Sequence, residues 1–386
     1  MPARRVRGPL IGVLTLTLGC RGGETDDDST IDPSGPSEQA DEIGSETASD
    51  SDSTDSSSTS TDSSSTDSSS TDSSSSSSES SSSSDTDPPV EFGFGRAQTS
   101  NVFTYDDLQL GDLDADGCAD LVTKGSGFPP RLNIYAGDCA GGFPGPAITR
   151  EITSFDAFVL GDLDADGRDD VITQASGAPP RLEAYLGGPA FALGPGTTSP
   201  VYTYDLLWAI DVDADGRAEL LTYQLDAFQP TVFTWSGPGD GSLIELASSE
   251  LIGFEFAASG RVDADAYGDL LIGSQGLSAQ VARWTGQADG SLSQSGPVEP
   301  IFNLGRMTLG DLDGDGLDDL LTDVPGNDWV VQLYANLGES FASDPQLFPG
   351  YGYWALRSAD LDADGRDDLI LALTGQPPRV ATWLSQ

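Results

Sequence analysis

The chain has 386 residues, with 63 Asp and Glu against 17 Lys and Arg, no histidine and a formal charge of −46. Such an acidic surface repels nucleic acids and anionic lipids and attracts cations, which argues against nucleic-acid binding. The lack of histidine excludes Ser-His triads, histidine general bases and histidine-ligated metal centres.

The N-terminus has the pattern of an export signal. Three arginines precede an apolar stretch, residues 9–18, that is too short to span a bilayer as a helix. Residues 16–20 (Leu-Thr-Leu-Gly-Cys) resemble the lipobox of bacterial lipoproteins, although Thr stands where that motif prefers Leu. The resemblance implies a signal peptide over residues 1–20 and a lipid on Cys20. The alternative is an ordinary secretory signal in which Cys20 has no role.

The residues after Cys20 bear on location. Arg21 replaces the Asp that marks inner-membrane retention in some bacteria, so we expect the outer membrane or cell surface; a periplasmic or secreted protein is the alternative. Residues 26–87 are dominated by Ser, Thr, Asp and Glu and cannot bury enough apolar surface to fold. We therefore predict a disordered linker over 21–89 and a folded domain over 90–386.

Six Asp-rich runs recur in the second part of the chain, and we call them loops one to six. They start at 112, 162, 211, 261, 311 and 360, so successive starts are 50, 49, 50, 50 and 49 residues apart. Loop two, for example, begins Asp-Leu-Asp-Ala-Asp-Gly-Arg-Asp-Asp. We number the nine residues of each loop as positions 1–9.

Each repeat also carries short apolar runs, such as residues 108–111, 121–123 and 132–135, separated by Gly/Pro turns such as 127–131. This pattern predicts three or four short antiparallel strands per repeat and almost no helix. A unit of this size is typical of a β-propeller blade, and ring closure leaves no long free edge. We predict an all-β fold, a β-propeller of six blades. Seven blades or a linear β-solenoid are the alternatives.

The loops favour calcium because Ca²⁺ prefers six to eight oxygen ligands. The alternation of Asp with small residues directs carboxylates to one centre, and four acids within nine residues repel each other without a cation. An EF-hand requires a Glu at the twelfth residue counted from the start of the loop, and helices on both sides. Here the twelfth residue is not Glu and the flanks are predicted strands, so an EF-hand is excluded. The alternative is an acidic surface turn without metal.

The motif D-x-D-x-D-G-x-x-[DE], followed by Leu-[Leu/Val/Ile] at this spacing, resembles the FG-GAP/VCBS repeats of integrin α-subunit and bacterial surface propellers. The resemblance covers about residues 95–386. In that family the side chains at positions 1, 3, 5 and 9 and the carbonyl at position 7 hold structural Ca²⁺. Carried over, it implies about five ions, with these ligands: Asp112, Asp114, Asp116, Asp120 and the Cys118 carbonyl; Asp162, Asp164, Asp166, Asp170 and the Arg168 carbonyl; Asp211, Asp213, Asp215, Glu219 and the Arg217 carbonyl; Asp311, Asp313, Asp315, Asp319 and the Leu317 carbonyl; Asp360, Asp362, Asp364, Asp368 and the Arg366 carbonyl.

Loop four departs from the motif. Arg261 stands at position 1 and Ala at position 6, so only Asp263, Asp265 and Asp269 remain. We predict that this loop binds metal weakly or not at all, with the Arg261 guanidinium able to pair with the carboxylates instead.

Cys118 and Cys139 lie in the first repeat, 21 residues apart. An exported protein meets an oxidising compartment, so a local disulfide is one expectation and two buried free thiols are the other.

Two classes of function fit these observations. The first is a monomeric calcium-binding adhesion module for a protein or glycan ligand, held at a membrane only through its lipid. The alternative is a secreted carbohydrate-active hydrolase or lyase that uses the paired acids Asp169/Asp170, Asp318/Asp319 and Asp367/Asp368. We predict no catalytic residues, because these acids recur between blades, whereas catalytic residues normally break a repeat.

Aromatic residues recur before the loops and are candidates for stacking on sugars; packing between blades is the alternative. Seven residues before each loop stand Tyr105, Phe155, Tyr204, Phe254, Leu304 and Tyr353. Nine residues before stand Phe103, Thr153, Tyr202, Ile252, Phe302 and Tyr351.

Overall fold

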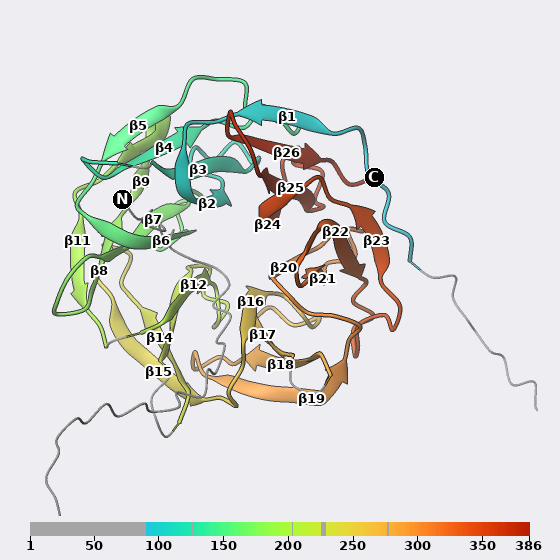
Figure 1. Ribbon diagram of the computed structural model, residues 1–386. Coiled ribbons are helices and arrows are strands. Elements are labelled where there is room, and N and C mark those ends of the chain that lie inside the picture. Colours follow the sequence, from blue (N-terminus) through green and yellow to red (C-terminus); the bar gives the residue numbers. More distant parts are fainter. Residues whose placement is uncertain (1–89, 126, 203, 225–228, 276–277) are drawn as a thin grey trace, which may run out of the picture. The chain divides into compact units, whose positions relative to one another are not determined.

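The computed structural model describes residues 90–386 except 126, 203, 225–228 and 276–277, so the predicted signal peptide, Cys20 and the predicted linker lie outside the described residues. The described chain forms six four-stranded antiparallel sheets set around a common centre (Figure 1). This arrangement confirms the predicted six-bladed β-propeller. Within the described part of the chain, no helix has the length and apolar character needed to cross a membrane.

The blades follow one another along the chain, and in each the first strand lies nearest the centre. From the innermost strand outward they are β2 (Tyr105–Gly111), β3 (Asp120–Gly125), β4 (Arg131–Tyr135), β5 (Ile148–Glu151); β6 (Phe155–Gly161), β7 (Asp170–Ala175), β8 (Arg181–Tyr185), β11 (Thr197–Pro200); β12 (Leu206–Ile210), β13 (Glu219–Gln224), β14 (Thr231–Ser236), β15 (Ile244–Glu250); β16 (Phe256–Gly260), β17 (Asp269–Ser274), β18 (Gln280–Gly286), β19 (Leu292–Pro300); β20 (Met307–Gly310), β21 (Asp319–Val324), β22 (Asn327–Tyr334), β23 (Gln346–Pro349); and β24 (Tyr353–Ala359), β25 (Asp368–Leu373), β26 (Arg379–Trp383), β1 (Gln98–Asn101). A small hairpin, β9 (Gly187–Gly188) and β10 (Ala192–Leu193), flanks the 3₁₀ turn η1 (Pro189–Phe191) in blade two.

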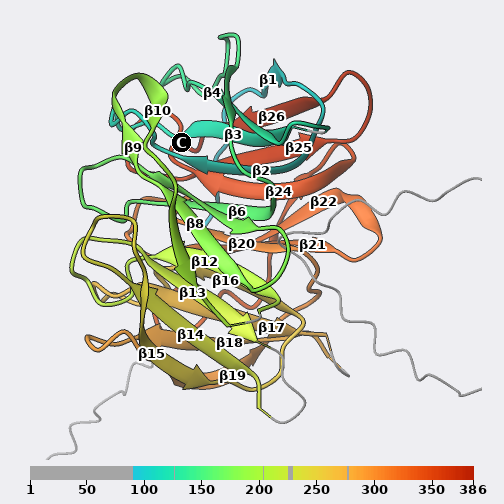
Figure 2. The same ribbon diagram turned by 90° about the vertical axis from the view of Figure 1, so that its left-hand side faces the viewer.

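The N-terminal strand closes the ring. β1 pairs with β26, the last strand of the chain, and the two lie side by side in both views (Figures 1 and 2). Beyond them, the Gln386 N–H donates to the Gly93 carbonyl at 3.1 Å. If each blade began with the residues before its loop, Gln98–Asn101 would belong to blade one; they pair instead in the sixth blade.

The apolar core lies between neighbouring blades. Leu113 and Val122 of blade one, for example, pack with Phe158 and Val171 of blade two, and all four are buried. Five similar clusters fill the other interfaces. Because the strands alternate apolar side chains toward both adjacent blades, each sheet is covered on its two faces and the ring is held by burial of apolar surface.

The two recurring sets of aromatic residues differ in exposure. Of the residues seven before a loop, Tyr105 is half-buried and the other five are at most 8% exposed, so packing between blades is the correct reading for that set. The set nine before a loop lies in the segments that cross from one blade to the next. Its five large members are between 48% and 75% exposed: Phe103, Tyr202, Ile252, Phe302 and Tyr351.

Candidate calcium-binding loops

Each loop joins the innermost strand of a blade to the second strand. Loop one leaves β2 after Gly111 and ends on Asp120, the first residue of β3. The same connection recurs in all six blades, so the loops lie at the C-terminal ends of the inner strands. The crossing segments with the exposed aromatics precede the same strands, which separates them from the loops by the length of a strand.

The carboxylate at position 1 folds each intact loop around itself. Asp112 Oδ1 accepts the Ala115 N–H at 2.7 Å, and its Oδ2 accepts the Gly117 N–H at 2.8 Å. The bond from the position-6 N–H recurs, at 2.9 to 3.0 Å, in loops two, three, five and six. It requires a left-handed backbone at position 6, where φ of Gly117 is 88°, which explains the Gly of the motif.

The carboxylate at position 5 has a different partner. In every loop it accepts the N–H of position 7, as Asp116 does from Cys118 at 2.9 Å. This turn fixes the backbone of position 7, whose carbonyl is a predicted ligand. The arrangement is an Asx turn, the local structure that Asp favours.

The carboxylate at position 9 is buried in all six loops and holds two parts of the blade together. Asp120 Oδ2 accepts the Leu113 N–H at 2.9 Å, and its Oδ1 accepts the Gly137 N–H, beyond β4, at 2.9 Å. The bond to the position-2 N–H recurs for Asp170, Glu219, Asp269, Asp319 and Asp368. Position 9 therefore has a structural role that the sequence did not reveal. Each carboxylate oxygen can accept more than one bond, so this role is compatible with binding a metal.

Positions 1, 3 and 9 converge. In loops one, two and three one carboxylate oxygen from each of these positions lies within 4.8 Å of the others: Asp112, Asp114 and Asp120; Asp162, Asp164 and Asp170; Asp211, Asp213 and Glu219. Three carboxylate oxygens at positions 1 and 3 are buried and have no hydrogen-bond partner among the described residues: Oδ1 of Asp114 in loop one, of Asp211 in loop three and of Asp362 in loop six. Buried, unpartnered carboxylate oxygens that face other carboxylates suit a hard cation, so the donor set fits Ca²⁺.

The electrostatics agree with this fit. Burial, followed by the neighbouring carboxylates Asp116 and Asp112, raises the pKa of Asp114, and the equivalent residues of the other four intact loops shift in the same direction. Burial raises the pKa of Asp120 to about 7 and that of Asp319 to about 8. In the described chain the only ion pairs that reach the loops are Arg168–Asp166 and Arg217–Asp215, both at position 5. The carboxylates at positions 1, 3 and 9 therefore have no salt bridge among the described residues.

Loop four differs in backbone as well as in sequence. It has no position-1 carboxylate to fold around, and neither Ala264 nor Ala266 adopts the left-handed conformation found in the intact loops. Carboxylate oxygens of Asp263, Asp265 and Asp269 still lie within 4.8 Å of one another. The suggested ion pair is not formed: Arg261 is exposed and has no carboxylate within 4.0 Å among the described residues.

Hydrogen bonds link the loops into a ring. The N–H of position 8 in each loop donates to the carbonyl oxygen of position 1 in the preceding blade, at 2.6 to 2.8 Å. The six bonds are Asp169 to Asp112, Ala218 to Asp162, Gly268 to Asp211, Asp318 to Arg261, Asp367 to Asp311 and Ala119 to Asp360. The last of these crosses the junction between the first and last blades, so the ring has no gap.

Three position-8 side chains also accept a hydrogen bond from the position-1 residue to which their own N–H donates. Asp318 Oδ2 accepts the N–H of Arg261 at 2.8 Å, and Asp169 and Asp367 are bonded in the same way by the main chain of Asp112 and Asp311. Burial raises the pKa of Asp169 to about 7. These three acids, which the sequence offered as catalytic partners, are half-buried between blades and accept hydrogen bonds from main-chain N–H groups.

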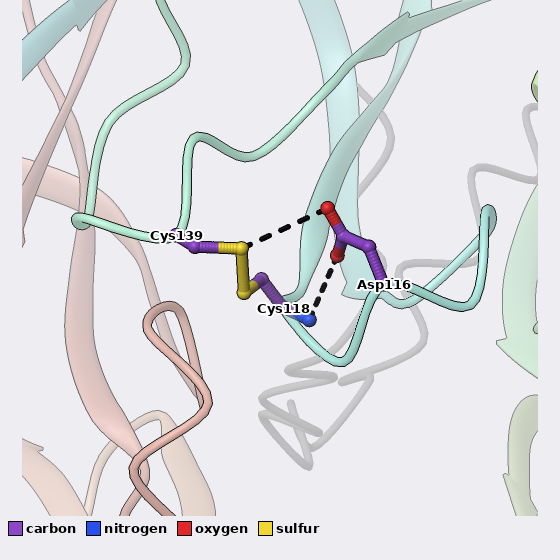
Figure 3. Close-up of side chains that lie close together, drawn as sticks. All are labelled: Asp116, Cys118 and Cys139. Atoms are coloured by element: carbon purple, nitrogen blue, oxygen red, sulfur yellow. Dashed lines mark hydrogen bonds between the residues drawn. A yellow bond between two sulfur atoms is a disulfide. The ribbon is translucent and has the colours of Figure 1, made fainter.

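A disulfide joins Cys118 of loop one to Cys139 (Figure 3). The Asp116 carboxylate lies beside it, with Oδ2 3.7 Å from the Cys139 sulfur. The segment that contains Cys139 also holds the closing strand: the Phe143 N–H donates to Ser100 Oγ at 3.0 Å, and Gln98 Nε2 donates to the Ala140 carbonyl. The disulfide thus connects loop one to the place where the ring closes.

No protein-family profile matches this sequence, and no curated protein matches it. Among solved structures, the chain is similar to part of the Photorhabdus luminescens Tc holotoxin pore (mutation TccC3-D651A), with 17% identity and a TM-score of 0.50 over 74% of this chain and 14% of that chain. Weaker similarities are to BBS1N in complex with ARL6DN (14% identity, TM-score 0.44, 74% of this chain and 83% of that one) and to the WD40 domain of Toxoplasma gondii coronin (11%, 0.43, 75% and 87%). The first likeness concerns the fold alone, and the chain is a six-bladed β-propeller with repeated Asp-x-Asp-x-x-x-Asp/Glu groups.

Proposed function

We propose that this protein is a calcium-stabilised propeller that serves as a non-enzymatic binding module at the cell surface. The observation that carries the calcium part is the set of buried, unpartnered carboxylate oxygens of Asp114, Asp211 and Asp362. Positions 1, 3, 5 and 9 of loops one, two, three, five and six would hold the ions, together with the position-7 carbonyls. The FG-GAP/VCBS resemblance of the motif supports the same assignment.

The role of the metal in this proposal is structural. Bound Ca²⁺ supplies positive charge that offsets the clustered carboxylates. The position-1 residue both faces the cluster and presents its carbonyl to the next blade, as Asp112 does to Asp169. A well-folded loop thereby also stabilises the loop of the next blade. A cation at each intact loop would stabilise the whole ring by binding the folded state.

Calcium content tests this directly. The full chain, loaded with Ca²⁺ and freed of excess by gel filtration, should carry about five ions by elemental analysis. Changing both Asp112 and Asp114 to Asn should remove one ion. The same two changes at Asp138 and Asp240, exposed acids outside the loops, serve as the control and should remove none. A protein that retains no calcium at micromolar free ion is not a calcium propeller.

The surface-display part rests on the N-terminal motif. A lipid on Cys20 and an acidic, Ser-rich linker would space the propeller from a membrane. Cys20→Ser should move the protein from the membrane fraction to the soluble fraction of an expressing bacterium. Equal membrane association of the two proteins would exclude the lipid anchor.

The ligand-facing surface in this proposal is the ring of crossing segments. Phe103, Tyr202, Phe302 and Tyr351 expose aromatic rings there, and such rings suit sugars or protein side chains. Glycan arrays and surface-protein pull-downs with the calcium-loaded full chain would identify the ligand. Replacing Phe103 and Phe302 by Ser should abolish binding. Leu347→Ser, an equally exposed apolar residue on the outer strand β23, is the control.

A further inference from the structure

The inner strands of the six blades enclose a central cavity of about 510 Å³. The residue three places before each loop lines it in every blade and holds an equivalent register, as Arg357 opposite Ile370 in the neighbouring strand and Trp208 opposite Leu221. We call these six the wall residues: Gln109, Val159, Trp208, Ala258, Thr308 and Arg357.

The wall residues do not repeat. At several other equivalent positions the blades keep one chemistry, such as the carboxylates of the loops or the large apolar residues seven before them. In the wall the same register position carries an amide, two aliphatic groups, an indole, a hydroxyl and a guanidinium. A purely structural role would not need this variety. Different polar and aromatic groups that converge on one cavity are typical of a small-molecule site.

The half-buried Arg357 has Asp107 near it but forms no salt bridge among the described residues. Of its five N–H donors, the one with a hydrogen-bond partner in the described chain is Nη1, which donates to the Leu356 carbonyl at 2.9 Å. No carboxylate lies within 4.0 Å of it among the described residues. The nearby acid Asp107 is itself buried, which raises its pKa to about 7, and its Oδ2 has no hydrogen-bond partner among the described residues. A half-buried charge with no carboxylate in direct contact is costly, so Arg357 is suited to an anion brought by a ligand.

Trp208 stands on the other side of the cavity. Its strand β12 is three blades away from β24, which holds Arg357, so the two residues belong to opposite sides of the six-bladed ring (Figure 1). Trp208 is half-buried, and its indole gives that side of the cavity a flat apolar group.

The acids of the cavity restrict the charge of a ligand. Asp156, Asp205 and Glu255 also line it, beside the N-terminal ends of the inner strands. They repel a dianion such as phosphate more strongly than a monoanion, and the charge of a single carboxylate can be offset by one guanidinium. Guanidinium and carboxylate match in shape and bind through two parallel hydrogen bonds.

We propose that the central cavity binds a small organic monocarboxylate with a planar apolar body. The guanidinium of Arg357 binds the carboxylate, and the indole of Trp208 packs against the body. The cavity volume lies within the range of about 300–1,000 Å³ usual for small-molecule pockets. This site is separate from the calcium loops and from the exposed aromatic residues of the crossing segments. It therefore adds a second ligand to the proposed function.

The test is calorimetric titration of the calcium-loaded full chain with benzoate and indole-3-acetate. We expect saturable binding of at least one of them. Benzamide, which lacks the charge, should bind at least about tenfold more weakly, a loss of about 1.4 kcal/mol, and inorganic phosphate should not bind. Failure of both carboxylates to bind at about 10 mM, or equal binding of benzamide, would overturn the proposal.

Variants locate the site. Arg357→Gln should weaken carboxylate binding at least tenfold, while the exposed Arg379→Gln, with the same change in charge, should not. Ala258→Leu fills the wall without changing charge and should also prevent binding. Arg357→Leu should keep or raise the melting temperature of the ligand-free protein, because it removes a half-buried cation that forms no salt bridge among the described residues. A lower melting temperature with unchanged probe binding would show that Arg357 is structural and contradict the proposal.

Discussion

The main-chain N–H of Ala119 in loop one donates a 2.8 Å hydrogen bond to the carbonyl oxygen of Asp360 in loop six. This bond joins the first and last blades at the level of the candidate metal sites. It completes the ring in which every loop is bonded to the one before it. The loops are therefore parts of the interfaces between blades. The stability of the propeller depends on each loop keeping its folded conformation.

Loop four can be restored. Arg261→Asp with Ala266→Gly supplies the position-1 carboxylate and the left-handed residue that fold the intact loops, while Asp263, Asp265 and Asp269 are already in place. We expect one additional Ca²⁺ per chain by elemental analysis. Arg261→Ala alone, the control, should leave the calcium content unchanged. An unaltered content in the double variant would mean that the convergence of carboxylates does not decide binding.

The calcium-free protein should lose stability as pH rises. Burial raises the pKa of Asp170 to about 6, of Asp120 to about 7 and of Asp319 to about 8 in the folded state. A raised folded-state pKa contributes stability that is complete below the ordinary carboxyl pKa of about 4 and is lost as pH passes through 6 to 8. The melting temperature of the calcium-free chain should fall between pH 5 and pH 8.

Calcium should reverse this trend, because it competes with protons for the same oxygens. The difference in melting temperature between calcium-loaded and calcium-free protein should grow from pH 5 to pH 8. A calcium-free protein whose melting temperature stays constant or rises between pH 5 and pH 8 would contradict this account, in which the acids at position 9 are buried and costly to ionise.

Between several pairs of blades, a glycine directly before one loop leaves room for the position-8 Asp of the next blade. A Cβ added to Gly111 would collide with Asp169 Oδ2, and the pairs Gly260 with Asp318 and Gly310 with Asp367 repeat the arrangement. Gly111→Ala should lower the free energy of unfolding by about 1–3 kcal/mol, measured by denaturant titration. Adding Asp169→Ala should recover part of this loss. Additive effects of the two changes would show that the residues do not compete for space.

Reduction of the disulfide should weaken ring closure. Replacing Cys118 and Cys139 by Ser should cost about 2–4 kcal/mol of stability. Since the Cys139 segment holds β1 through Ser100, protease cleavage near β1 should also become faster. Dithiothreitol should have the same two effects on the natural protein and none on the variant. Equal cleavage rates for both proteins would separate the disulfide from closure.

Much of the fold was readable from spacing alone. Six loops at intervals of 49 or 50 residues, flanked by short apolar runs, predict six blades because each strand pairs mainly with its neighbours in sequence. The partner of β1 was not predictable in this way. Gln98–Asn101 would pair equally well with any blade edge, and only closure of the ring brings them to β26.

The grouping of the acidic side chains was predictable from the motif, but the contacts between blades were not. Motif reading assigned the position-9 acids to the metal, whereas their bonds to distant main chain, such as Asp120 with Gly137, depend on tertiary structure. A signal for the interfaces was present in the sequence. The one bulky residue directly before a loop, Ile210, faces Gly268, the one glycine at position 8.

The central claim is that calcium in the loops holds the propeller together, and a thermal melt of the full chain tests it most directly. Removal of calcium should lower the midpoint by many degrees, because ions bound only to the folded state add to the free energy of unfolding. Added calcium should restore the midpoint, and magnesium should do so less well because it demands a tighter octahedral shell. A midpoint that is the same with and without calcium would contradict the account.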